Sequence, residues 1–166
     1  MNLLISVLLY YFAKLLCFAL GPIARFHTLI DQLRFGNKTR LADSYYLGAY
    51  GLDVYANATY ASFFNAYFLA KGGYHFGVDG ETVSSALGKN WTMGSLTIMG
   101  EGCTGMLNLI DHDHCWKYII GPWPHVKPAP VRWWKILLFA LALLLVLILS
   151  LAFIIWAGFT LAKAAI

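Results

Sequence analysis

Five consecutive side chains in the second half of the sequence could bind a metal or carry a proton: Asp111, His112, Asp113, His114 and Cys115. Zinc accepts imidazole, thiolate and carboxylate ligands, so these residue types suit a metal site. Neighbouring residues of a helix or turn point in different directions, so two or three of them at most can converge on one ion. His112, His114 and Cys115 are therefore the candidate ligands, with Cys103 or His75 needed to complete the site.

Nucleophilic catalysis is the other chemistry that this region suggests. Cys115 with His114 would need a lowered thiol pKa, a neighbouring base and an oxyanion pocket, and the sequence shows none of these. A hydrolase that used Ser84 or Ser85 would lack the G-x-S-x-G setting of such a nucleophile. The sequence also contains no phosphate loop, dinucleotide fingerprint or paired-histidine metal helix. It therefore indicates no cofactor and favours a protein that is not an enzyme.

Structural roles offer another interpretation of the same side chains. Asp111 and His114 are expected to hold a turn together and to be tied to the start of a nearby helix. An acid near the start of a short helix complements its dipole, and Gly88 is expected to end that helix. The expected capping residues are Glu81, Thr82 and Ser84.

Two short elements in this region carry a resemblance. Residues 79–85 read Asp-Gly-Glu-Thr-Val-Ser-Ser, and residues 109–115 read Leu-Ile-Asp-His-Asp-His-Cys. Together they resemble a family of small uncharacterised phage and prophage proteins, which carry D-E-T-[ILV]-S-S after a glycine pair and I-D-x-x-H-C downstream. The matching residues are Glu81, Thr82, Ser84, Ser85, Asp111, His114 and Cys115. Gly80, Ala86 and Asp113 depart from the pattern, and the resemblance, confined to residues 50–115, implies a viral or prophage origin but no particular activity.

The clearest structural element is a run of 27 residues, from Ile136 to Ala162, without charge or proline. At about 1.5 Å per residue, a helix of this length exceeds the roughly 30 Å of hydrocarbon in a bilayer. A chain of 166 residues is too short to enclose such a helix in a soluble core. Trp134 and Trp156 are spaced so that each would lie near one membrane interface. Residues 136–162 are therefore predicted to form a transmembrane helix.

A second apolar segment, residues 1–21, is predicted to form the other transmembrane helix. Its single charge, Lys14, lies in the middle of the segment, which is not the pattern of a signal peptide. Lys14 could line a polar path or an oligomer seam, or it could extend to the interface or pair with a polar group such as Asp53. On a helix, one polar stripe facing protein or water would be formed by Asn2, Ser6, Tyr10 and Lys14.

The sequence between the two spans divides into three parts. Residues 22–40 predict an amphipathic juxtamembrane helix that begins at Pro22 and ends near Gly36. It could lie on the membrane surface or pack against a neighbouring helix. Residues 41–120 predict a small helical middle domain, in which residues 91–110 form one helix interrupted by glycines. Residues 121–135 form a linker rich in proline and tryptophan. The predicted fold class is thus an all-α integral membrane protein with two transmembrane helices flanking a small helical middle domain.

The first part of the middle domain is unusually aromatic. Residues 41–70 include nine tyrosines and phenylalanines but only two charged residues, so residues 44–70 could form a third span. Asp53, Asn57 and Asn65 favour a helix half-buried at the interface instead, because a carboxylate in lipid is costly. Asp53 and Asn57 lie one turn apart on the same face, and both are candidate functional residues.

Basic residues gather beside both predicted spans: Arg25, Arg34, Lys38, Arg40, Lys117, Lys127, Arg132 and Lys135. Only Lys163 and the terminal amine lie on the far side, so the positive-inside rule predicts a cytoplasmic middle region and external termini. The net charge of +4 indicates attraction to anionic lipid headgroups, and no basic run resembles a nucleic-acid patch. The predicted location is therefore a membrane crossed more than once, the bacterial inner membrane being favoured.

The opposite orientation also fits some residues. In an exported middle region Cys103 and Cys115 could form a disulfide, and the sequons at Asn37, Asn57 and Asn90 could carry glycans. In a reducing cytoplasm the two thiols would be free.

Two functional hypotheses follow. The first is a non-enzymatic phage or prophage protein that acts at the host inner membrane through helix association, as a holin-related lysis accessory or a superinfection-exclusion factor. Its partners would be the lipid bilayer and either a second copy of the chain or another membrane protein. The second is a membrane-tethered, metal- or thiol-dependent protein built on His112, His114 and Cys115.

Overall fold

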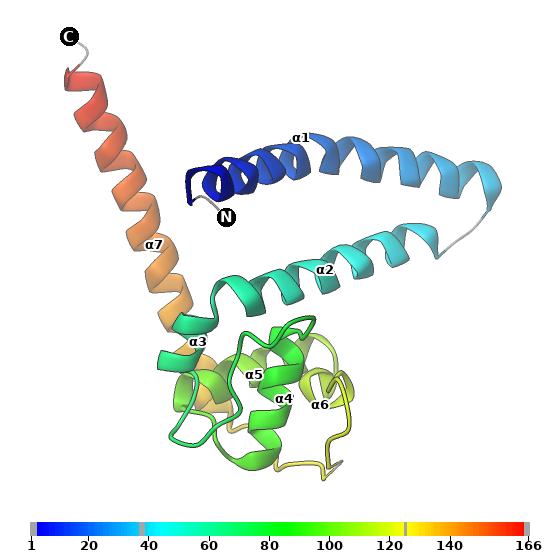
Figure 1. Cartoon of the computed structure of the whole chain (residues 1–166), viewed down its shortest axis with the longest axis vertical. Coiled ribbons are helices and arrows are strands. Elements are labelled where there is room, and N and C mark those ends of the chain that lie inside the picture. Colours follow the sequence, from blue (N-terminus) through cyan, green and yellow to red (C-terminus); the bar gives the residue numbers. More distant parts are fainter. Residues whose placement is uncertain (1–2, 37–38, 125, 165–166) are drawn as a thin grey trace. The chain divides into compact units, whose positions relative to one another are not determined.

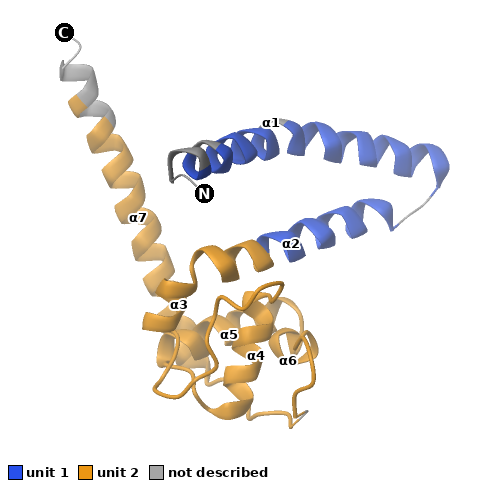
Figure 2. Cartoon of the chain, viewed as in Figure 1, with its two compact units in different colours: residues 1–52 blue, residues 53–166 orange. Residues whose placement is uncertain are grey.

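The computed structural model describes residues 3–36, 39–124 and 126–164, and this part of the chain forms seven helices (Figure 1). They are α1 (Leu3–Phe35), α2 (Arg40–Thr59), α3 (Ala61–Tyr67), α4 (Val83–Met93), α5 (Ile98–Ile110), α6 (His114–Lys117) and α7 (Trp133–Ala164). Over the described residues the predicted all-helical class is confirmed. The chain divides into two compact units, residues 1–52 and 53–166, which are described separately (Figure 2).

In the first unit, the C-terminal half of α1 packs against the start of α2. The Arg25 guanidinium lies 4.9 Å from the centroid of the Tyr45 ring, and Gln32 accepts a hydrogen bond of 2.9 Å from the Leu41 amide. Gly36, with a φ of 68°, ends α1 in the left-handed conformation, as its position predicts. Asn2 and Asn37 lie outside the described residues.

The expected helix boundary at Pro22 is absent, because α1 continues from Leu3 to Phe35 with the proline inside it. An internal proline removes one backbone hydrogen bond and crowds the carbonyl of the preceding turn, which can bend a helix without ending it. The helix-forming residues on both sides extend α1 across Pro22. Over the described residues, the predicted boundary between residues 21 and 22 therefore does not separate two helices. Two helical segments among the described residues are long and apolar enough to cross a membrane, Leu9–Phe35 and Trp133–Ala157, with mean hydropathies of 1.3 and 3.2.

The aromatic segment is divided between two helices. Helix α2 ends at Thr59, and α3 begins after Tyr60, whose φ of −107° and ψ of 16° depart from helical geometry. Neither helix is among the two segments that could cross a membrane. In α3, Phe64 packs against the core of the second unit, and the Asn65 side chain exchanges hydrogen bonds with the backbone of Phe76.

The core of the second unit surrounds α4, whose residues from Val83 to Trp91 are all buried. Around it pack side chains from the loops and from α6: Phe68, Phe76, Leu96 and Cys115. Thr82 is the N-cap of α4 and its hydroxyl accepts a hydrogen bond of 3.0 Å from the Ser85 amide, which confirms its predicted capping role. This small core positions the polar groups described below.

Gly88 does not end this helix as expected, because α4 continues to Met93 and Gly94 terminates it in the left-handed conformation. A Cβ atom at position 88 would lie 1.9 Å from the carbonyl oxygen of Cys115. Glycine is therefore needed there for close contact between α4 and α6. The apolar pattern of residues 91–110 accordingly belongs to two helices, α4 and α5, rather than one.

Two glycines of α5 let its backbone approach α7. A Cβ at Gly102 would lie 2.5 Å from the Lys135 carbonyl oxygen, and one at Gly105 would lie 2.5 Å from Ile136. The Lys135 ammonium also forms an ion pair with Glu101 of α5. Helix α7 begins at Trp133, three residues before the predicted span, because these contacts hold its first turn in helical form.

Candidate functional site

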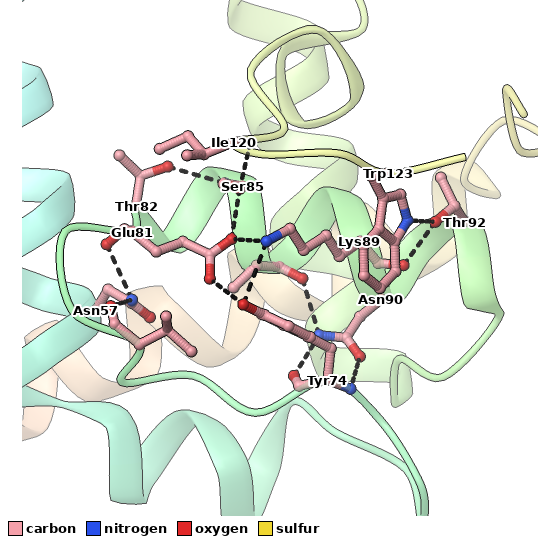
Figure 3. Close-up of polar contacts among 12 residues, drawn as sticks. Asn57, Tyr74, Glu81, Thr82, Ser85, Lys89, Asn90, Thr92, Ile120 and Trp123 are labelled. Carbon is pink, nitrogen blue, oxygen red and sulfur yellow. Dashed lines mark hydrogen bonds and ion pairs between the residues drawn. The ribbon is translucent and has the colours of Figure 1, made fainter. Parts of the chain in front are cut away.

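A buried ion pair lies at the centre of the second unit. The Lys89 ammonium and the Glu81 carboxylate are 2.5 Å apart, and only 9% and 4% of these side chains are exposed (Figure 3). The same carboxylate accepts hydrogen bonds of 2.6 Å from Ser85 and 2.7 Å from the Tyr74 hydroxyl. Full hydrogen bonding of this kind is what a buried carboxylate requires.

Aromatic rings enclose the lysine of this pair. The Lys89 ammonium lies 4.3 Å from the Tyr74 ring centroid and 5.4 Å from that of Trp123. Burial by itself lowers the pKa of Lys89, but its hydrogen bonds to Glu81 and Tyr74 outweigh burial and raise the pKa above the ordinary value. Burial, followed by the bond to Glu81, raises the pKa of Tyr74. The lysine is therefore charged and the tyrosine neutral at physiological pH.

Two fully buried asparagines fasten the loop of residues 73–81 to the helices. Asn57 of α2 donates a hydrogen bond of 2.9 Å to the Glu81 carbonyl and accepts one of 3.1 Å from the Gly77 amide. Asn90 of α4 donates a bond of 2.7 Å to the Tyr74 carbonyl and accepts one of 2.7 Å from the Tyr74 amide. Both amide side chains are fully buried and hydrogen-bonded, so a glycan could be attached to either sequon only if the domain opened.

Asp53 supplies the acid at the start of α4. Its carboxylate accepts a hydrogen bond of 3.4 Å from the Ser84 amide, although the two residues are 31 positions apart. Asp53, and not Glu81, is therefore the acid that complements the dipole of α4. Lys14, in the first unit, lies over the Tyr10 ring at 4.6 Å. Each of these two candidates thus contacts a group in its own unit.

Ser84, His114 and Asp111 form a continuous hydrogen-bonded chain. His114 Nε2 is 3.2 Å from the Ser84 hydroxyl, and His114 Nδ1 is 3.2 Å from the Asp111 carboxylate. The pKa of Asp111 is lowered by its bonds to His114 and Lys117. This connection between α4 and the turn before α6 is the structural role predicted for these residues.

The same chain has the connectivity of a nucleophile, a base and an orienting acid. Ser84, however, is buried among the core residues of α4, and its amide faces the carboxylate of Asp53. An oxyanion formed there would be repelled by that carboxylate rather than stabilised. The geometry supports a clamp between elements more than a site for acyl transfer.

The three candidate metal ligands do not converge. His112 Nδ1 is 3.1 Å from Asp113, His114 is bonded to Asp111 and Ser84, and Cys115 is fully buried against α4. Over the residues that the structure describes, no group of three His, Cys, Asp or Glu side chains could hold a metal ion. Their divergence follows from their adjacency, since neighbouring side chains of a tight turn point apart.

The two thiols of the second unit are free, with Cys115 buried and Cys103 partly buried. Burial, with a smaller effect from Asp53, raises the pKa of Cys103 to about 12. Burial also raises the pKa of Cys115 well above its ordinary value. Because the thiolate is the reactive form, both cysteines are poor nucleophiles at neutral pH.

The sequence alone did not predict that Lys89 and Tyr74 are partners of Glu81, or that the Trp123 ring lies beside Lys89. Residues 81, 85 and 89 recur at intervals of four, and this spacing places an acid, a hydroxyl and an amine on one helical face. That pattern was the available signal for the buried pair. Nothing in the sequence indicated the aromatic partners, since Tyr74 comes from the loop before α4 and Trp123 from the loop before α7.

The two elements that carry the resemblance meet in space. Ser84 of the first element lies 3.2 Å from His114 of the second. Just beyond these elements, the Ser85 hydroxyl accepts a hydrogen bond of 2.8 Å from the Ile120 amide, and Gly88 allows the close approach of the Cys115 carbonyl. In comparisons with known proteins, no family model, curated protein or solved structure matches this chain.

Proposed function

We propose that this chain is a non-enzymatic membrane protein of phage or prophage type, anchored by two helices in the bacterial inner membrane. It would act there through helix association, as a holin-related lysis accessory or a superinfection-exclusion factor. Its partners would be the bilayer, with its anionic headgroups, and a second copy or another membrane protein.

The observation that carries the proposal is the surface of α7. Its described side chains between Leu141 and Trp156 are almost all exposed and apolar, which water would strongly disfavour and lipid would satisfy. Its first turns pack against α5. The second candidate span, in α1, supports a chain that crosses the bilayer twice.

Two further features support the choice of role and orientation. Ser6, Tyr10 and Lys14 lie on one face of α1, and polar groups on an apolar helix favour association inside lipid. The basic residues beside both candidate spans favour a cytoplasmic middle region. The phage or prophage assignment relies on the resemblance of residues 79–85 and 109–115.

Lys14→Leu is expected to change the effect of the protein on host cells, because it removes the charge from the polar stripe. It also removes an insertion cost of about 2.5–3.5 kcal/mol. The measurements are membrane potential by a voltage-sensitive dye, growth, and phage sensitivity after induction. The matched controls are Lys14→Arg, which keeps the charge, and Leu15→Ala, which changes only apolar volume. If expression of the wild type alters none of the three readouts, the effector role is refuted.

A serine hydrolase is the second candidate, favoured only by the Ser84–His114–Asp111 chain. Because Ser84 is buried, we expect no covalent labelling of the folded, full-length protein by a fluorophosphonate probe and no turnover of short p-nitrophenyl esters. Labelling that disappears in both Ser84→Ala and His114→Ala, with the fold intact, would replace the effector role with a hydrolase.

A further inference from the structure

We propose that the end of the second unit formed by α3 and the first turn of α5 penetrates the bilayer beside α7. The apolar tip comprises Phe63, Tyr67 and Ile98, and its ligand is the interfacial layer of lipid. The proposal depends on the membrane insertion of α7 proposed above. It identifies the part of the domain that contacts the membrane.

Positions along α7 indicate how deep its neighbours would lie in the bilayer. Trp133 and Trp134 stand at its start, where tryptophan prefers the membrane interface. Phe139 lies six residues further along, which is about 9 Å at 1.5 Å per residue. Groups packed beside Phe139 would therefore lie below the interface, in the layer that interfacial helices reach at roughly 5–10 Å.

The tip lies at the level of Phe139. The ring of Phe68, directly after α3, is 6.1 Å from the Phe139 ring. Helix α5 runs antiparallel to α7, since Gly105 faces Ile136 and Val131 while Gly102 faces Phe139. Ile98, one turn before Gly102, consequently lies at least as deep as Phe139. Figure 1 shows α3 and α5 beside the first turns of α7.

The side chains of the tip are apolar and exposed. Phe63, Tyr67 and Ile98 are 53%, 60% and 49% exposed, and the first two rings contact each other with centroids 4.9 Å apart. The Phe63 ring contacts the Phe68 ring, which in turn contacts Phe139 of α7, so the tip adjoins α7. The same lipid that covers α7 would cover them.

Backbone groups beside the tip form hydrogen bonds within the protein, as a medium without water requires. The Thr97 amide donates to the Phe68 carbonyl at 2.9 Å, the Thr97 hydroxyl donates to the Tyr67 carbonyl at 2.6 Å, and the Ala70 amide donates to the Ser95 carbonyl at 2.8 Å. Lipid demands such internal pairing, because an unsatisfied backbone group costs several kcal/mol there. An ordinary surface loop would leave some of these groups to water.

The test measures the depth of single probes in the full-length protein, reconstituted in phosphatidylglycerol-containing vesicles. In a Cys17→Ser background, an environment-sensitive fluorophore is attached at Ile98→Cys or, separately, Phe63→Cys. The matched control is Ile110→Cys, an exposed apolar position at the other end of α5. Leu144→Cys on α7 is the positive control, and lipids with a nitroxide on the upper acyl chain are the quencher.

We expect probes at positions 98, 63 and 144 to be quenched about threefold more than the probe at 110, which lies about 18 Å from position 98 along α5. Quenching at 144 combined with equal, weak quenching at 98, 63 and 110 would overturn the bilayer-penetrating tip alone. Crosslinking of position 98 between two copies, with no quenching, would assign the tip to a dimer and also overturn it. Absence of quenching at 144 would refute the membrane insertion of α7 itself.

Discussion

Gly88→Ala is expected to lower the free energy of unfolding by about 3 kcal/mol, at the upper end of the usual cost of overpacking. The added Cβ would lie 1.9 Å from the Cys115 carbonyl oxygen and 2.8 Å from the Cys115 carbonyl carbon. Both are backbone atoms, so α6 would have to move away from α4. That movement would also weaken the contacts of Ser84 with His114 and of Ser85 with Ile120.

The effect can be measured as the thermal midpoint of the detergent-solubilised protein, followed by near-ultraviolet circular dichroism. A loss of this size corresponds to a decrease of about 6–12 °C for a chain of this length. Gly51→Ala is the matched control, because no atom lies within 4 Å of the added Cβ and alanine favours a helix. A Gly88→Ala protein that melts with the wild type would show that α4 and α6 are not in backbone contact.

Lys89→Met is expected to be at least as damaging, at about 3–5 kcal/mol, because it leaves the Glu81 carboxylate buried without its counter-charge. The substitution also removes the contacts of the ammonium with the Tyr74 and Trp123 rings. Glu81→Gln should cost less than Lys89→Met, since the single amide oxygen of glutamine can still accept the bond from Ser85 or the one from Tyr74. The Lys89 ammonium also keeps its contacts with the Tyr74 hydroxyl and the two aromatic rings.

The double variant Glu81→Gln/Lys89→Met distinguishes the interaction between the two charges from the packing of their side chains. We expect it to be more stable than the sum of the two single losses predicts, because no buried charge remains. Lys127→Met, which removes an exposed ion pair with Asp113, is the control and should leave the midpoint unchanged. Strict additivity of the two single effects would contradict a coupled buried pair.

Several elements could be predicted from local sequence because their causes are local. Helix α7 follows from an uninterrupted apolar composition, and Gly36 and Thr82 define helix ends through the conformation and hydrogen bonding of a few neighbouring residues. A residue whose role depends on a contact far away in the sequence could not be interpreted in the same way. Gly88 looks like a helix end in isolation, yet its function is to admit the backbone of Cys115, 27 positions away.

The amino-acid sequence by itself determined the helical class, the apolar segments and the identity of the residues around Ser84 and His114. The tertiary structure alone decided that Asp53 faces the start of α4, that Glu81 turns inward to Lys89, and that Cys115 is buried instead of joining His112 and His114. Helix formation depends on neighbours three or four residues apart, which the sequence displays directly. Burial and ion pairing depend on which distant segments meet, and the core around α4 establishes those contacts.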